Sequence, residues 1–207
     1  MKLLLIRHSE PDPGRDVLDP PLTEHGRRLA AATGQWLAGE GITAVYSSTS
    51  RRAAETAELI AGSVGAPLVV REGLAEFGAG QEYVPVEELR RTGDARWAAM
   101  AAGDLAIFGT DADTFRAEAS AAVGAIADAH PGQTVAVVAH AGVINAYLSD
   151  MLDIDRLLWV ELDYAAICRM AVSRSGVRSV LALNERPHGC GLPSVSLLTT
   201  PLPGGIS

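Results

Sequence analysis

The chain has 207 residues, of which 48% are hydrophobic and 20% charged. This composition is typical of a globular domain with a sizeable core, and it excludes disordered and fibrous proteins. The formal net charge of −8 argues against nucleic acid or an anionic membrane as a partner, because both attract clustered positive charge. An anionic ligand would therefore need a local basic pocket.

No apolar run approaches the roughly 18 residues of a membrane helix. The first run, residues 3–6, is also too short for a signal peptide. We therefore expect a cytoplasmic protein with no membrane contact. In that compartment the two cysteines, Cys168 and Cys190, are expected to be reduced, inert thiols.

In the first part of the chain, short apolar runs alternate with helical patterns. Residues 2–7 form an apolar run typical of a strand buried on both faces. A helix with Thr23 as N-cap follows and stops at Gly39 and Gly41. Three further elements follow in chain order: a strand at 42–46, a helix at 52–64 and a short strand at 67–70.

The later part of the chain continues the alternation after a weakly patterned insertion, which is expected to be helical, at about 85–109. Apolar spacing then predicts a helix that ends before His130. The run 134–139 predicts a central strand, followed by a helix from Gly142 to about Met151. Two late strands, at about 166–173 and 177–183, are joined by a short turn and are expected to be antiparallel neighbours.

We therefore predict one α/β domain spanning residues 1–207. It is a three-layer sandwich with a mostly parallel central sheet, one antiparallel edge strand and helices on both faces. The segment at about 190–207 is an apolar extension without clear periodicity, which could cover a pocket, contact another subunit or be loose. Ligands of such sheets bind beyond the carboxyl ends of the strands.

Two of the five histidines fall at those predicted strand ends. His8 follows the first strand and His140 follows the strand at 134–139, whereas His25 and His130 are expected to be ordinary packed or surface side chains. Arg7 lies next to His8, and Arg51 and Arg52 follow the strand at 42–46. Guanidinium groups bind phosphate through paired hydrogen bonds. Phosphate is therefore the simplest ligand for a site at these strand ends.

Four segments in chain order resemble the signature blocks of the histidine phosphatase superfamily, the phosphoglycerate mutase-like proteins. They are residues 5–11, 21–26, 46–57 and 138–144, and the stretch 183–188 is similar to the end of that family's last strand. The resemblance covers about residues 2–190. It implies hydrolysis or transfer of a phosphoryl group through a phosphohistidine, with no cofactor.

The resemblance also implies roles for individual residues. His8 matches the nucleophile, and Arg7 and His140 match members of the phosphate pocket. Within the third block the pocket arginine falls on Arg52, so that Arg51 is expected to be a solvated neighbour. Glu76 matches the usual proton donor; its alternative is a surface carboxylate, in which case Glu10, Glu72 or Glu82 would be the candidates.

Departures from the family pattern favour a phosphatase over a mutase. The family's common block reads Arg-His-Gly-Glu-Thr, with an Asn three residues further on. In this chain Ser9, Pro11 and Gly14 stand where that block has Gly, Thr and Asn, so two polar contacts are missing. Nothing in 82–109 matches the insertion with which cofactor-dependent mutases bind a substrate carboxylate. The expected partner is a small phosphorylated metabolite of unknown identity, and a homodimer is left open.

Two other classes compete with this interpretation. A metallohydrolase could use the histidines with Glu76, Asp12, Asp16 or Asp19, but the chain lacks a close ligand pair such as His-x-His, and two pocket arginines would repel a cation. We therefore expect no metal. The second rival is a non-catalytic module that binds a phosphorylated ligand. Loss of Arg7, His8 or His140 would indicate such a module, and this chain keeps all three.

Overall fold

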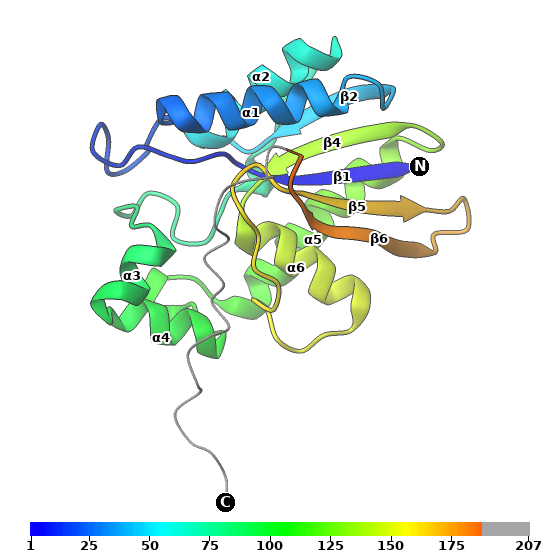
Figure 1. The fold of residues 1–207 in the computed structure, drawn as a ribbon. Helices are drawn as coiled ribbons and strands as arrows, with labels where there is room; N and C mark the ends of the chain where they lie inside the picture. The colour runs from blue at the N-terminus through cyan, green and yellow to red at the C-terminus, as the bar shows by residue number, and fades with distance from the viewer. Residues whose placement is uncertain (188–207) are drawn as a thin grey trace, which may run out of the picture.

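The computed structural model describes residues 1–187, and the expected extension at 190–207, together with Cys190, lies outside them. One six-stranded sheet organises the chain, in the order β3-β2-β4-β1-β5-β6 (Figure 1). Its strands are β1 (Lys2–Arg7), β2 (Ile42–Ser47), β3 (Leu68–Val70), β4 (Thr134–Ala139), β5 (Ile167–Val172) and β6 (Arg178–Glu185). The first four are mutually parallel. The predicted mostly parallel α/β sheet is confirmed.

The predicted hairpin at the sheet edge is formed by β5 and β6. β5 pairs antiparallel with both β1 and β6, so the strand of opposite direction lies inside the sheet and β6 forms the edge. The structure extends β6 to Glu185, two residues beyond the predicted end of that strand. These two extra residues place Asn184 beside the loop that precedes β5.

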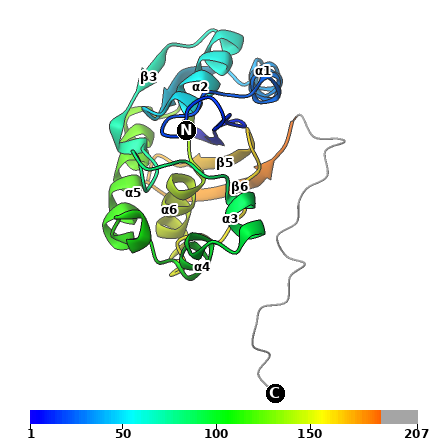
Figure 2. The same cartoon turned by 90° about the vertical axis from the view of Figure 1, so that its left-hand side faces the viewer.

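Helices cover both faces of the sheet and give the predicted three layers (Figures 1 and 2). On one face lie α1 (Glu24–Leu37) and α2 (Arg51–Val64), and on the other lie α5 (Ala112–Ala129) and α6 (Ala141–Leu152). The side chain of Thr23 accepts a hydrogen bond from the backbone N–H of Gly26, which confirms the predicted N-cap of α1.

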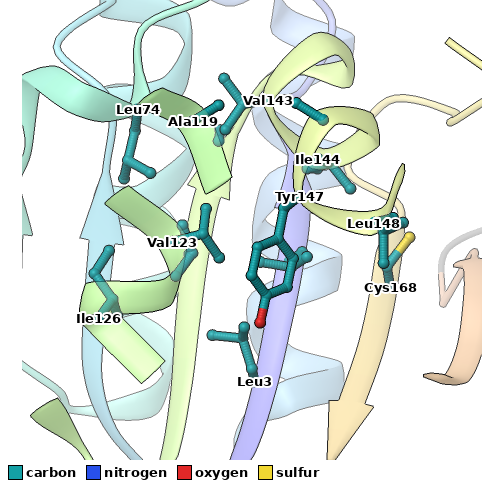
Figure 3. Close-up of a cluster of buried hydrophobic side chains, with 14 of the residues drawn as sticks. Leu3, Leu74, Ala119, Val123, Ile126, Val143, Ile144, Tyr147, Leu148 and Cys168 are labelled. Atoms are coloured by element: carbon teal, nitrogen blue, oxygen red, sulfur yellow. The ribbon is translucent and has the colours of Figure 1, made fainter. Parts of the chain in front are cut away.

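The central strands are buried on both faces because their side chains alternate between two cores. In β1, Leu3 and Leu5 pack towards α5 and α6, whereas Leu4 and Ile6 pack towards α1 and α2. The first of these cores includes the side chains drawn in Figure 3, among them Tyr147 and Cys168. Cys168 is buried, and it forms no disulfide within residues 1–187.

The predicted helical insertion lies on the side of the molecule where the parallel strands end (Figure 2). It consists of α3 (Val86–Thr92), α4 (Ala95–Ala102) and the short 3-10 helix η2 (Ala106–Phe108), and another short helix, η1 (Glu72–Leu74), follows β3. Among residues 1–187, no helix has the combination of length and apolar character that a membrane crossing requires.

Candidate active site

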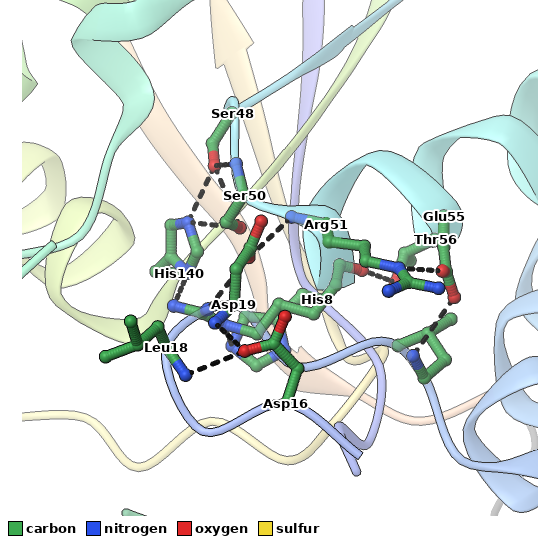
Figure 4. Close-up of polar contacts among 12 residues, drawn as sticks. His8, Asp16, Leu18, Asp19, Ser48, Ser50, Arg51, Glu55, Thr56 and His140 are labelled. Carbon is green, nitrogen blue, oxygen red and sulfur yellow. Dashed lines mark hydrogen bonds and ion pairs between the residues drawn. The ribbon is translucent and has the colours of Figure 1, made fainter. Parts of the chain in front are cut away.

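The carboxyl ends of β1, β2 and β4 gather the chemically active side chains at one place (Figure 4). Arg7 is the last residue of β1 and His8 follows it, while His140 follows β4 and is the N-cap residue of α6. Arg52 lies in the first turn of α2, after β2. All four side chains are buried: Arg7 and Arg52 are 9% and 8% exposed, and His8 and His140 are 3% and 0% exposed.

The hydrogen bonds of His8 define its protonation. Its Nδ1 lies 2.8 Å from the carbonyl oxygen of Ser9, which can only accept, so Nδ1 carries the proton. Its Nε2 accepts a hydrogen bond from Nε of Arg52 at 3.3 Å and therefore presents a lone pair. Burial, followed by the charge of Arg52, lowers the pKa of His8 well below 6.5. His8 is thus a neutral imidazole whose Nε2 carries no proton.

His140 is held in the opposite tautomer beside His8. Its Nδ1 lies 3.4 Å from Nη2 of Arg52, a donor, and its Nε2 lies 2.8 Å from Oγ of Ser48. The two imidazole centroids are 5.1 Å apart. Burial, and then the charges of Arg52 and Arg7, lower the pKa of His140 well below its usual value. Neutral His140 can therefore donate a hydrogen bond without repelling the guanidinium groups.

The guanidinium of Arg7 has one edge occupied and one atom unsatisfied. Its Nη1 donates to the carbonyl oxygen of Leu162, and its centre lies 4.1 Å from the ring centroid of Tyr164. Its Nε is buried without a hydrogen-bond partner among the described residues. A buried N–H of a charged group is costly to leave unpaired, so a hydrogen-bond acceptor next to this atom would be favourable.

Arg52 lies between the two histidines and a carboxylate. Its Nη1 is 4.0 Å from Oδ1 of Asp19, a side chain that is 49% exposed, and its centre is 4.8 Å from the ring centroid of Tyr83. The neighbouring Arg51 is different: its side chain is 50% exposed and forms an ion pair with Glu55 at 2.9 Å. Arg52 is thus buried beside the two histidines, whereas the side chain of Arg51 faces solvent.

Glu76 comes from the loop that follows η1 and reaches the start of α6. Its Oε2 accepts a hydrogen bond from the backbone N–H of Gly142 at 2.9 Å. Burial outweighs this bond and the charges of Arg52 and Arg7, and it raises the pKa of Glu76 to about 7. At neutral pH both the acid and the carboxylate are therefore populated, as a proton donor and acceptor requires.

Gly142 makes this approach possible. A Cβ atom at that position would lie 2.1 Å from Oε1 of Glu76 and 2.7 Å from the ring of Phe77. Only glycine leaves this space, so the glycine two residues after His140 has a positional role that the sequence pattern does not reveal.

The other carboxylates considered from the sequence lie elsewhere or have other partners. Glu10 accepts from the hydroxyl of Thr23 at 3.1 Å. Glu72 lines a hollow of about 430 Å³ between its own loop and α5; the hollow also includes Glu76 but none of the pocket arginines or histidines. We therefore do not assign this hollow to the phosphate pocket.

The three aspartates considered as metal ligands accept hydrogen bonds from backbone N–H groups. Asp12 accepts from Gly14, Asp16 accepts from two residues that follow it, and Asp19 accepts from Arg51. In the described part of the chain, no group of three or more His, Cys, Asp or Glu side chains is arranged to hold a metal ion.

Ser9, a departure from the family block, is a buried structural residue here. Its Oγ donates to the carbonyl oxygen of Gly26 at 2.7 Å, and its backbone N–H donates to Oγ1 of Thr56 at 2.9 Å. Thr56 in turn donates to the carbonyl oxygen of Arg52 at 2.7 Å. This chain of bonds ties the backbone after His8 to the first turns of α1 and α2.

Known proteins resemble this chain in sequence and in fold. The profile of the histidine phosphatase superfamily (branch 1) matches residues 3–185. The chain belongs to the histidine phosphatase superfamily. A curated relative, fructose-2,6-bisphosphatase TIGAR B of Danio rerio, is 35% identical over 104 residues, and the match covers 45% of this histidine phosphatase and 40% of the relative. The chain thus spans less than half of that relative's length.

Solved structures share the fold over most of its length. YhfR of Bacillus stearothermophilus superposes with a TM-score of 0.73 at 27% identity, covering 89% of this chain and 96% of the other. A mycobacterial glucosyl-3-phosphoglycerate phosphatase gives 0.69 at 20% identity, covering 89% and 99%. A phosphoglycerate mutase from Bacillus anthracis gives 0.72 at 22% identity, covering 90% and 93%. The last two likenesses concern the fold alone.

Proposed function

We propose that this histidine phosphatase hydrolyses a phosphomonoester of a small metabolite through a phosphohistidine at His8. The observation that carries the proposal is the lone pair on Nε2 of a neutral, buried His8, held beside Arg52 by the bond from its Nδ1 to Ser9. A neutral imidazole is a competent nucleophile, and two guanidinium groups stabilise the charge that develops on the transferring phosphoryl group.

The first chemical step forms one bond and breaks another. Nε2 of His8 attacks phosphorus, and the bond from phosphorus to the alcohol oxygen breaks. Glu76, in its acid form, gives its proton to the departing oxygen, so that the alcohol leaves neutral. In the second step the Glu76 carboxylate takes a proton from water, whose oxygen attacks phosphorus; inorganic phosphate leaves and His8 regains its lone pair.

Arg7, Arg52 and His140 are proposed as the phosphate-binding residues. The unpaired Nε of Arg7 supports this assignment, because a phosphate oxygen is an acceptor that would satisfy it. The two guanidinium groups supply the positive charge that a divalent cation supplies in other phosphatases, so we propose that turnover needs no metal. A cytoplasmic location, a homodimer and a single domain over residues 1–207 stay predictions.

Hydrolysis is favoured over transfer between two positions of one substrate. Arg51, the other arginine that follows β2, is paired with Glu55 and faces solvent. It therefore does not add a second anion-binding group to the pocket, as a mutase would need. The name of the Danio rerio relative suggests fructose 2,6-bisphosphate as one compound for a substrate panel.

The experiment compares wild type with His8→Ala and a matched control, His25→Ala, on p-nitrophenyl phosphate and a panel of phosphorylated metabolites. We expect turnover in wild type and in the control, and no turnover in His8→Ala. After rapid quenching, a protein-bound phosphate label that is labile in acid and stable in alkali should be found only in the proteins that keep His8. Excess chelator should not change the rates. Full activity in His8→Ala refutes the mechanism, and loss on chelation that zinc or magnesium restores refutes metal independence.

A further inference from the structure

Each pocket arginine lies against the face of a tyrosine ring. The guanidinium centre of Arg7 is 4.1 Å from the ring centroid of Tyr164, and that of Arg52 is 4.8 Å from the ring centroid of Tyr83. The two phenol oxygens are 3.4 Å apart and form a hydrogen bond. Together Tyr83 and Tyr164 make a tyrosine arch that joins the two arginines.

The two halves of the arch come from segments far apart in the chain. Tyr83 precedes α3, and its backbone N–H donates to the carbonyl oxygen of Val17 at 2.7 Å. Tyr164 lies in the loop before β5 and its ring centroid is 5.8 Å from that of His8. The arch therefore connects the loop after β1, the segment before α3 and the loop before β5.

Tyr164 is fixed in place through the residue that precedes it. Asn184, near the end of β6, accepts a hydrogen bond from the backbone N–H of Asp163 at 2.8 Å and donates to its carboxylate at 2.9 Å. Arg186 lies 3.5 Å from the same carboxylate. Burial raises the pKa of Tyr164 well above its usual value, so its phenol stays protonated.

Stacking on a ring has a specific consequence for a guanidinium. The ring attracts the cation and occupies one of its faces, so the planar group presents its N–H edge to the pocket. A free arginine side chain would lose considerable rotamer entropy on binding phosphate, and an already oriented one loses less. For Arg7, the ring and Leu162 leave the unpaired Nε for the ligand.

We propose that Tyr83 and Tyr164 are positioning residues that hold Arg52 and Arg7 in the orientation that binds the phosphoryl group. The inference rests on the proposed function and deepens it, since it adds two residues that act on the substrate only through the arginines. Neither tyrosine belongs to the blocks on which the family resemblance was based.

The test is the affinity of each variant for orthovanadate, measured as inhibition of p-nitrophenyl phosphate hydrolysis. Tyr83→Leu and Tyr164→Leu remove the ring and should weaken vanadate binding about 3- to 30-fold each, the range expected for a lost cation–π contact. KM should rise more than kcat falls. The matching Phe variants keep the ring face and should restore most of the affinity.

Two comparisons separate positioning from general loosening of the fold. Each Leu variant should bind vanadate more weakly and yet unfold at a urea midpoint near that of wild type. Trp36→Leu, at an aromatic residue of α1 that is 57% exposed and remote from the arch, should leave the vanadate affinity unchanged. Tyr83 is half-buried and lies outside the sheet, so its variants provide the test even if a Tyr164 variant does not fold.

The outcomes also distinguish this inference from the proposed function. If wild type neither hydrolyses phosphomonoesters nor binds vanadate, the proposed function fails. If wild type does both but the Leu variants bind vanadate as tightly, or the Phe variants lose as much affinity as the Leu variants, the arch has no positioning role.

Discussion

Replacing Glu76 by glutamine should stabilise the protein at alkaline pH and have no effect near pH 4.5. Burial raises the pKa of this carboxyl from its ordinary 4.5 to about 7 in the folded state. The folded protein therefore favours the acid form. Relative to the unfolded chain, ionisation of Glu76 costs nothing below pH 4.5. The cost in unfolding free energy grows between pH 4.5 and about 7 and stays constant above that range.

The size of this cost follows from the shift. At about 1.36 kcal/mol per pKa unit, the shift corresponds to about 3 kcal/mol at full ionisation. Because Glu76 keeps some solvent exposure, we expect about 2 kcal/mol above pH 8. Glutamine is uncharged and can still accept the hydrogen bond from Gly142, so the variant removes the charge and retains the contact.

The assay is urea unfolding of wild type and Glu76→Gln from pH 4.5 to 9, with Glu72→Gln as the control. Glu72 lines the same hollow and is exposed, so its variant should follow wild type at every pH. The difference in unfolding free energy between Glu76→Gln and wild type should rise from near zero to about 2 kcal/mol. A difference that is constant with pH, or a variant less stable at pH 9, would contradict the assigned burial of this carboxyl.

Four further predictions concern activity and ligand binding. Glu76→Gln should slow an alkyl phosphate by about 10² to 10⁴ and a nitrophenyl ester much less, since nitrophenolate leaves without a proton; equal losses would mean that Glu76 is not the acid. The wild-type rate on the alkyl phosphate should fall as the pH rises through about 7, and this alkaline decline should be absent from Glu76→Gln in a pH–rate profile. Arg52→Ala should weaken vanadate inhibition at least about 100-fold and Arg51→Ala by no more than a few-fold; the reverse order would place the wrong arginine in the pocket. Gly142→Ala should reproduce the leaving-group dependence of Glu76→Gln, because its Cβ would displace the carboxylate; unchanged kinetics on both esters would show that the carboxylate tolerates the move.

The main elements could be predicted from the sequence because each carries a strong local signal. The run at 134–139 is β-branched and small, and it forms β4 over the same residues. Thr23 is a standard capping residue and caps α1. The sequence predicts helical structure in the insertion at 85–109 but not the bounds of its helices. Its two α-helices have only seven and eight residues, so each shows about two turns of periodicity.

The sequence by itself also determined the positions of the proposed nucleophile and phosphate ligands. His8 and His140 directly follow buried strands, and parallel strands end at one edge, so their proximity follows from chain order and topology. The choice of Arg52 over Arg51 came from the family block, and the helix geometry agrees with it, because successive residues of a helix point in different directions.

Only the tertiary structure decided the properties that depend on contacts between distant segments. The raised pKa of Glu76 arises from burial against the start of α6, 66 residues away along the chain. The tyrosine arch joins residues 81 positions apart, and no local pattern marks either tyrosine as a neighbour of an arginine. Local sequence fixes which backbone conformations are favourable, but desolvation and ring stacking depend on what the folded chain brings alongside, and this information exists only after the layers have packed.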